Sequence, residues 1–322
     1  MGLGRHVALR LFYTPFLIIL IMMLTFLIVQ SAPGDPVMYL VSGLEHAPPG
    51  FIEAKRAELG LDKPIYERMI IYIRDMFTGN FGYSFIYGSA VSDVILDKLK
   101  NTLILTVTAF LIEVFAGTIL GIVAARRRYS VVDAAISVSA LAFWAMPFFW
   151  MAILAILIFA FYIPIFPIGG MMTPGTTGMN AYPDIAWHLF LPATVLGLGR
   201  LGLYTRMTRA SILEVMHQDY ILTAWSKGCD ERTVLFKHAL RNALLPLVTL
   251  LGLRMGNLFM GAVLVEIVFG WPGMGTLIYD AIFTRDYAIV QLSFLMISIV
   301  TVMSNLAADI AYAIVDPRIR YK

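Results

Sequence analysis

The sequence predicts an all-α integral membrane protein with six transmembrane helices. Hydrophobic residues make up 59% of the 322-residue chain and charged residues only 14%, so there is too little polar surface to cover a soluble globule. Several apolar runs reach the roughly 20 residues that a helix needs to cross the hydrocarbon layer. These runs must be helical, because lipid cannot satisfy the hydrogen-bonding groups of an open backbone.

The six spans follow from the positions of these runs. The first run, from Leu11 to Val29, is longer than the core of a signal peptide, which has about 7–15 residues, so we predict that it remains as a span. The expected spans lie near Leu9–Ala32, Asn101–Ala125, Val131–Ile163, Ala186–Thr208, Ala243–Phe269 and Ala288–Val315.

The distribution of Lys and Arg predicts the orientation, since short cytoplasmic loops are enriched in these residues. Basic residues gather before the first span, between the second and third, between the fourth and fifth, and after the sixth. They are Arg5, Arg10, Arg126, Arg127, Arg128, Lys227, Arg232, Lys237, Arg241, Arg318, Arg320 and Lys322. The opposite short loops hold almost none, so we expect both termini to be cytoplasmic.

These expectations divide the chain into four parts. Residues 1–32 form the cytoplasmic N-terminus and the first span, and residues 33–100 form an extracytoplasmic segment. Residues 101–315 form a core transmembrane domain that includes a cytoplasmic loop at 210–242, and residues 316–322 form a cytoplasmic tail.

The extracytoplasmic segment is expected to be helical. The stretch from Phe51 to Leu59 favours a short helix that ends at Gly60, and Pro64 suits the first turn of another helix, which ends near Gly79. On this second helix, apolar residues recur every three or four positions and form one face: Ile65, Met69, Tyr72, Ile73 and Met76. The helix lies against the membrane or neighbouring spans, or it belongs to a platform for an external protein; both interpretations stay open.

The polar insert between Asp219 and Pro246 is the most informative stretch, because it interrupts a strongly apolar sequence. We expect a helical piece from Tyr220 to Ser226, a break at Gly228 and a second helical piece from Asp230 to Asn242. An ordered insert of this kind indicates a surface on which another protein docks. The alternative is a solvated connector.

Motifs along almost the whole chain resemble those of one family, in the same order. They are Pro33–Pro36, Leu59–Pro64, Gly79–Gly82, Arg206–Arg209 with Glu214-Val215, His238–Pro246, Val265–Gly273, Arg285–Tyr287 and Asp316–Arg320. Each motif is weak alone, but their order and spacing together are specific. The chain resembles the dipeptide/oligopeptide branch of the ABC importer permeases, which are inner membrane components of binding-protein-dependent transport systems.

This resemblance implies the type I ABC importer transmembrane-domain fold, in a prokaryotic plasma (inner) membrane. Besides the lipid bilayer, it implies three kinds of partner: a second homologous permease subunit, two cytoplasmic ATPase subunits and an extracytoplasmic substrate-binding protein. The ATPases would close around ATP and drag the docked helices of the permeases together, and the pathway would switch between inward-facing and outward-facing states.

The resemblance also places the ATPase-coupling residues. Tyr220, Ala224 and Gly228 fall in the coupling loop of the family, and Asp219, at the start of the insert, is grouped with them. Trp225 departs from the family pattern, which usually has Arg there, and an aromatic side chain suits an apolar ATPase pocket. We therefore expect a charge at Ala224, or Gly228→Pro, to leave the protein inserted in the membrane but to uncouple ATP hydrolysis from uptake.

The sequence gives no sign of catalytic chemistry. It contains no Gly-Lys pair, and the phosphate-binding loop of ATPases requires one, so ATP and Mg are expected on the partner subunits and no cofactor on this chain. It also lacks the His-Glu-x-x-His metal motif and the Gly-x-Ser-x-Gly elbow, and its five histidines are scattered. We predict a transport subunit that is not an enzyme, has no metal site and binds no nucleic acid.

Ionisable residues within the spans are costly and often functional. They are Glu113, Arg200, Arg254, Glu266 and Asp309. Arg254 and Glu266 are twelve positions apart, roughly 18 Å along a helix, which is too far for direct pairing, so Glu113 or Asp309 is the expected partner of Arg254. The two open interpretations are structural ion pairs and a translocation path in which Arg200 and Arg254 meet an anionic end, such as a peptide C-terminus.

Small residues four positions apart, at Gly117 and Gly121 and at Gly252 and Gly256, are interpreted as close helix packing.

The predicted function is a permease subunit of an ATP-driven importer of di- or oligopeptides, which forms half of a pathway that works by alternating access. The same machinery importing nickel, oligosaccharides or another small solute is the alternative. An ion-driven secondary transporter explains the buried charges but not the coupling loop.

Overall fold

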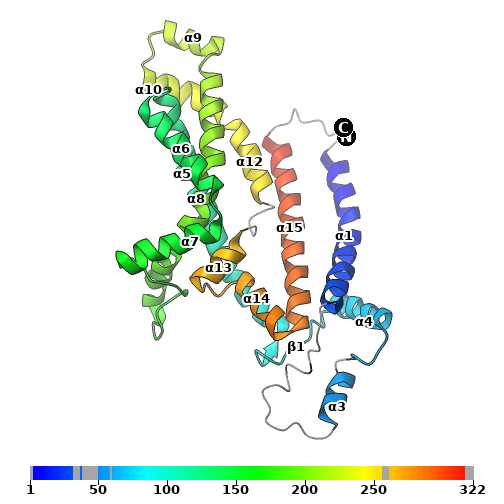
Figure 1. Ribbon diagram of the computed structural model, residues 1–322. Helices are drawn as coiled ribbons and strands as arrows, with labels where there is room; N and C mark the ends of the chain where they lie inside the picture. Colours follow the sequence, from blue (N-terminus) through cyan, green and yellow to red (C-terminus); the bar gives the residue numbers. More distant parts are fainter. Residues whose placement is uncertain (1–2, 32–36, 38–49, 59, 256–260, 316–322) are drawn as a thin grey trace. The chain divides into compact units, whose positions relative to one another are not determined.

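The computed structural model describes residues 3–31, 37, 50–58, 60–255 and 261–315, and these residues are almost entirely helical (Figure 1). The first elements are α1 (Leu3–Ser31), α3 (Phe51–Glu58), α4 (Ile65–Thr78), β1 (Tyr83–Ser84), β2 (Ser89–Ala90), α5 (Val91–Arg126) and α6 (Val131–Ala145). The next are α7 (Phe148–Ile156), η1 (Leu157–Tyr162), η2 (Gly178–Asn180), α8 (Ala181–Val215), α9 (Asp219–Ser226), α10 (Glu231–Thr233) and η3 (Val234–Ala239). The last are α11 (Leu240–Ala243), α12 (Leu245–Met255), α13 (Ala262–Phe269), α14 (Met274–Thr284) and α15 (Tyr287–Val315).

The chain forms two compact units. One contains residues 1–101 and 273–303, and the other contains residues 102–272 and the end of α15 from Ser304. The first unit therefore combines residues 1–101 with a segment, residues 273–303, that lies far away in the sequence.

Among the residues that the structure describes, four helices are long and apolar enough to span a membrane: Phe12–Ser31, Val91–Arg126, Gly178–Val215 and Tyr287–Ala307. Two bent helix pairs raise the number of candidate spans to six. The helical membrane fold is confirmed, but the predicted third and fifth spans are not single helices.

The predicted third span, Val131–Ile163, is broken at Pro147. The helix α6 ends at Ala145, α7 begins at Phe148, and the two are bent by 106°. Proline lacks a backbone N–H and disfavours helical geometry at the residue before it, and Met146 is accordingly extended with ψ 134°. Sequence hydropathy could not show this bend, because the apolar character continues through it.

The predicted fifth span, Ala243–Phe269, also differs in the structure. The helix α12 ends at Met255, and a separate helix α13 begins after Gly261, whose φ of 87° is left-handed. A second left-handed glycine, Gly270 with φ 60°, ends α13, and α14 follows at an angle of 78°. Glycine at both positions permits a backbone that other residues rarely adopt.

Close packing of α5 on α8 forms the centre of the second unit. A Cβ at Gly117 would lie 2.7 Å from Cβ of Tyr204, and one at Gly121 would lie 2.5 Å from Cβ of Thr208. Neither distance is possible between real carbon atoms, so only glycine lets the helices approach this closely. The packing interpretation of this glycine pair is confirmed, whereas Gly256 lies outside the described residues.

The first unit contains the expected extracytoplasmic helices. The helix α4 begins after Pro64 and ends at Gly79, which has the left-handed φ of 77°, as predicted. Its Tyr72 is buried and stacks on Phe26 of α1, with 5.6 Å between ring centroids. A two-stranded antiparallel hairpin, β1–β2, follows α4 and was not expected, because its strands are only two residues long.

Candidate functional site

The loop between α8 and α12 is folded as expected. The helix α9 matches the predicted helical piece, and Gly228 breaks it with a left-handed φ of 77°. The second piece is also present, although its middle is the π-helix η3. We call residues 210–242 the coupling loop.

The coupling loop has a hydrophobic core of its own. Ile221 and Ala224 of α9 pack with Val234 and Ala239 of η3, and all four are buried. Val215, Met216 and Cys229 close this core at its edge. Burial of these side chains fixes α9 against the rest of the loop, so the loop is an ordered platform and not a solvated connector.

The other face of α9 exposes large apolar side chains. Leu222 is 57% exposed and Trp225 is 41% exposed. Tyr220 is also exposed, and its hydroxyl accepts a hydrogen bond of 2.8 Å from Nδ2 of Asn242 in α11. An exposed aromatic and aliphatic pair on a short, rigid helix is typical of a surface that another protein covers.

The structure divides the five predicted coupling residues into two groups. Asp219, Tyr220, Trp225 and Gly228 are exposed. Ala224 is only 5% exposed and packs inside the loop, so it helps to hold α9 against η3. Leu222, which the sequence interpretation omitted, lies on the exposed side; its position one turn before Trp225 is the signal that could have revealed it.

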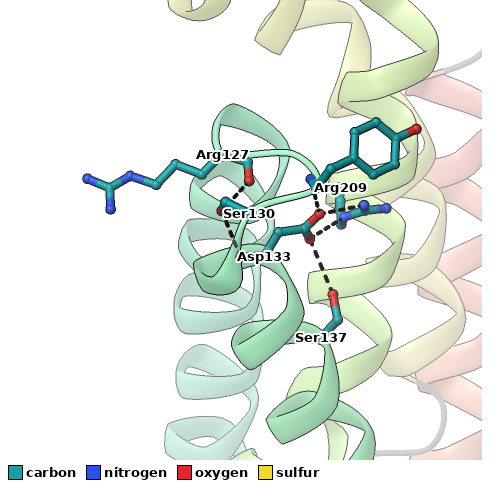
Figure 2. A network of polar contacts seen from close by, with 6 residues as sticks. Arg127, Ser130, Asp133, Ser137 and Arg209 are labelled. Carbon is teal, nitrogen blue, oxygen red and sulfur yellow. Dashed lines mark hydrogen bonds and ion pairs between the residues drawn. The ribbon is translucent and has the colours of Figure 1, made fainter.

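Two ion pairs tie the coupling loop and its supporting helix to neighbouring helices. Nε of Arg126, the last residue of α5, donates to Oε1 of Glu231 at 3.1 Å. Arg209 of α8 donates from Nε and a terminal nitrogen to the two oxygens of Asp133 in α6, at 2.6 and 2.7 Å (Figure 2). This bidentate geometry fixes the orientation of both side chains as well as their distance.

Asp133 is the centre of a larger polar network, shown in Figure 2. It accepts a hydrogen bond from the backbone N–H of Tyr129, whose φ of 60° is left-handed, and one from Ser137 Oγ. Ser130 caps α6 by accepting from the backbone N–H of Asp133. The network holds the turn between α5 and α6 against α8, and the sequence interpretation missed it because Asp133 and Arg209 are 76 positions apart.

The predicted charged residues of the second unit form a buried cluster. Nε of Arg254 donates to Oε1 of Glu113 at 2.9 Å, and the Glu113 side chain is only 1% exposed. Electrostatic interactions link Arg200 with Arg254 and Glu113, and its guanidinium lies 5.4 Å from the ring centre of Phe148. The cluster therefore joins α5, α8 and α12 and holds two cations and one anion.

Tyr204 belongs to this cluster and was not predicted. It interacts electrostatically with Glu113, Arg200 and Arg254, and it is fully buried. Its hydroxyl has no hydrogen-bond partner among the residues that the structure describes. A tyrosine in an apolar span gives no sequence signal of such a position, because aromatic residues are frequent in cores.

The remaining two predicted residues are Glu266 and Asp309. Glu266 of α13 is buried and accepts a hydrogen bond of 2.6 Å from Oγ1 of Thr102 in α5. The side chain of Asp309 lies outside the described residues. Among the described residues, no group of three or more His, Cys, Asp or Glu side chains is arranged to hold a metal ion.

Helical candidate spans, a self-packed polar loop and a buried charge cluster together are typical of a membrane transport protein. Residues 117–321 match the family "Binding-protein-dependent transport system inner membrane component", and residues 5–106 match the corresponding N-terminal family. The chain belongs to this family of ABC transporter permeases of the inner membrane. Members of such systems work with ATPase and binding-protein partners.

Relatives of known name match over nearly the full length. The chain is 38% identical to the oligopeptide transport system permease protein AppB of Bacillus subtilis over 306 residues, which cover 94% of each chain. It is 36% identical to the di/tripeptide transport system permease protein DppB of Pseudomonas aeruginosa, over 93% of this chain and 94% of that protein. It is also 36% identical to the dipeptide transport system permease protein DppB of Escherichia coli, over 94% of each chain.

Proposed function

We propose that this chain is one of two homologous permease subunits of an ATP-driven importer of di- or oligopeptides. Each subunit forms half of a translocation pathway that works by alternating access. The peptide class is supported by the names of relatives that match along nearly the whole chain. ATP and Mg bind to two partner ATPases, and an extracytoplasmic binding protein delivers the solute.

The proposed orientation places both termini and the coupling loop in the cytoplasm. The exposed face of α9, with Leu222 and Trp225, seats in an apolar cleft of an ATPase subunit. Movement of α9 then passes to α8 through the core of the loop and to α5 and α6 through Arg126–Glu231 and Asp133–Arg209. The observation that supports this function most directly is the rigid loop with an apolar outer face.

The buried cluster supports a role in the solute pathway. Two guanidinium groups and one carboxylate leave a net positive charge, and an anion would stabilise that charge in a setting of low dielectric constant. We propose that Arg200 and Arg254 meet the C-terminal carboxylate of a passing peptide, while Glu113 holds Arg254 between transport events. Glu266 and Asp309 remain candidates for the same pathway.

Reconstituted transport tests the coupling proposal. Leu222→Asp and Trp225→Asp should each lower peptide uptake by roughly tenfold or more, while the amount of inserted protein stays unchanged. Val131→Asp is the matched control, since it adds the same charge to an apolar side chain that is 85% exposed but lies outside α9. Normal ATP-dependent uptake by both α9 variants would contradict the proposal.

The solute is tested separately. Mass spectrometry of the ligand on the co-purifying binding protein should identify peptides; nickel or an oligosaccharide there would replace the peptide assignment. Arg200→Gln should lower uptake of free-acid peptides more than uptake of amidated peptides. Equal effects on both would remove the carboxylate role and leave the importer assignment intact. Uptake driven by an ion gradient without ATP would favour a secondary transporter instead.

A further inference from the structure

The first compact unit contains a cavity of about 260 Å³ whose largely apolar lining includes a group of polar and charged side chains. It lies among α1, α4, the hairpin segment and the start of α15. Its polar lining residues include Gln30, Arg68, Tyr72, Arg285, Asp286 and Gln291. We call it the polar cavity. Neither the coupling loop nor the buried cluster includes any of these residues.

The charges around the polar cavity favour an anion. Arg68 and Arg285 supply two guanidinium groups, and Asp286 supplies one carboxylate. Both carboxylate oxygens of Asp286 already accept hydrogen bonds, one from Ser84 Oγ at 2.5 Å and one from the Ile289 N–H at 3.3 Å. Asp286 therefore serves as a cap of α15, and the charged side chains that line the cavity are two cations and one anion.

Arg68 is held in place at the wall of this cavity. It is half-buried and donates to Oε1 of Gln30 at 2.6 Å. Burial lowers the pKa of Arg68, which means that its charge is poorly solvated. A partly desolvated guanidinium gains more from a phosphate than a solvated one does, and its planar fork suits two phosphate oxygens.

Tyr72 adds an unused donor beside Arg68. It is 8% exposed and lines the same cavity, and its hydroxyl has no hydrogen-bond partner among the residues that the structure describes. Burial raises the pKa of Tyr72 to about 12, so the hydroxyl keeps its proton at physiological pH. A buried hydroxyl without a partner is costly, and a ligand oxygen would relieve that cost.

A second cavity, of about 250 Å³, lies beside the same helices and is almost wholly apolar. Its lining residues are Thr25, Ile28, Val29, Ala281, Ile282, Tyr287, Val290 and Phe294. Tyr287 lines both cavities. Phe294 is seven residues beyond Tyr287 along α15, roughly 10 Å further into the span. We call this the apolar cavity.

The two cavities together match an amphipathic ligand at a membrane surface. Gln30 is at the end of the span Phe12–Ser31, and Tyr287 begins the span Tyr287–Ala307, so the polar cavity lies where two spans leave the hydrocarbon layer. The apolar cavity follows the same spans inward. A phosphate with a hydrocarbon chain attached meets both environments, whereas a free anion meets only the first.

We propose that α1, α4, α14 and α15 bind an anionic phospholipid, with its phosphate beside Arg68 and Arg285 and one acyl chain in the apolar cavity. Basic pockets between transmembrane helices on the cytoplasmic side of membranes bind anionic lipid head groups, and we expect the same attraction between charges here. In the proposed orientation this lipid belongs to the outer leaflet. Its binding adds to the contacts that hold α4 and the hairpin at the ends of α1 and α15.

The test uses the purified, delipidated full-chain permease complex, without ATP or solute. Phosphatidylglycerol should raise its melting temperature more than phosphatidylcholine does, and soluble glycerol 3-phosphate should not reproduce the effect. Arg68→Gln should weaken the response to phosphatidylglycerol by roughly tenfold in half-saturating concentration. Arg74→Gln is the matched control on α4, because Arg74 is exposed and does not line the cavity.

A second variant covers the possibility that Arg68→Gln does not fold. Ile282→Trp fills the apolar cavity from a side chain that is already 53% exposed, and it should weaken phosphatidylglycerol binding while the protein stays folded. Equal responses to the two lipids, or an unchanged response in both variants, would overturn the proposal. Saturation by glycerol 3-phosphate alone would also overturn it and assign a free-anion site. Since the assay needs no transport, its failure leaves the importer function untouched.

Discussion

The coupling loop and the crossing of α5 with α8 lie in the same compact unit, but they are built in opposite ways. At the crossing, a Cβ on Gly121 would lie 2.5 Å from Cβ of Thr208 and 2.7 Å from the carbonyl oxygen of Thr205. The helix α9 buries only Ile221 and Ala224 and leaves Leu222 and Trp225 exposed. At the crossing, each helix is covered by the other helix of the same chain. The outer face of α9 is a surface that the chain does not cover.

Because of this difference, changes at the crossing and changes on α9 should affect different properties: the stability of the fold and the interaction with a partner. A change at the crossing alters contacts between two long helices and should destabilise the whole unit. A change at Leu222 or Trp225 on the outer face of α9 removes less buried surface, so its main effect should be on the interaction with a partner. Four further experiments test this contrast, from the largest expected effect to the smallest.

The largest effect is expected from Gly121→Leu. A Cβ added at Gly121 already meets Cβ of Thr208 and the carbonyl oxygen of Thr205 in α8, which cannot move away without separating the helices. We expect a loss of about 3 kcal/mol or more in the free energy of unfolding, measured by denaturant titration in detergent. Ile119→Leu is the control, since Ile119 is 58% exposed on the same helix and should change stability by less than about 0.5 kcal/mol. Equal stability of the two variants would contradict the tight crossing.

The Glu113–Arg254 pair gives the next largest effect. Glu113→Gln leaves Arg254, whose side chain is only 12% exposed, without its carboxylate, and removal of one partner of a buried pair costs about 3–5 kcal/mol. The double variant Glu113→Gln/Arg254→Gln should be more stable than Glu113→Gln alone, because Arg254 no longer lies buried without its carboxylate. A double-mutant cycle measures this difference. Additive losses would show that the two groups do not interact.

Ala224→Asp should act locally. The new carboxylate would lie in the small core with Ile221 and Val234, and burial of a polar group without a partner costs about 1–3 kcal/mol. We expect faster proteolysis within the coupling loop and unchanged stability of the spans. Leu222→Asp should leave proteolysis unchanged. The structure thus revises the expectation that a charge at Ala224 affects coupling alone.

The smallest effect concerns Asp286 in the other compact unit. Burial raises the pKa of Asp286 above its ordinary value, although hydrogen bonds from Ser84 and the Ile289 N–H act in the opposite direction. Because the folded-state pKa is then the higher one, the folded state binds more protons between the two values. The stabilisation that Asp286 contributes should therefore be fully present below its unfolded-state pKa of about 3.9. It should be lost as the pH rises through the folded-state pKa.

Asp286→Asn should remove this pH dependence. Thermal melts in detergent at a series of pH values from about 3.5 upward measure it. The wild-type chain should lose stability over the first part of the series, while the variant should show a smaller change. An identical pH profile for both proteins would mean that another group titrates. In contrast to Glu113, which pairs with Arg254, Asp286 is stabilised by neutral donors.

Much of the fold was predictable because its signals are local. The apolar runs predicted the spans, and the Gly and Pro positions predicted the ends of α4 and α9. The Gly117 and Gly121 pair predicted close packing, though not its partner helix. The breaks at Pro147 and before α13 at Gly261 are exceptions: proline and glycine mark local changes, but the hydropathy of the sequence continues through both.

The site was predictable only in part. The sequence identified the coupling loop and its two helical pieces, but it assigned Ala224 to coupling when that side chain faces the interior. It identified Glu113 and Arg254 as candidates for pairing, but it gave no sign of Tyr204 or of the Asp133–Arg209 pair. These contacts join residues that are far apart in sequence, and no local pattern records them.

The sequence by itself determined that this protein lies in a membrane and where a polar loop interrupts its spans, because hydropathy and backbone preference act on neighbouring residues. Only the tertiary structure decided where two predicted spans break, which side of α9 faces outward, which carboxylate accepts from Arg254 and how two segments far apart in the sequence enclose the polar and apolar cavities. The reason is physical: burial and ion pairing depend on which helices meet, and that choice is made by the shapes of all the side chains together.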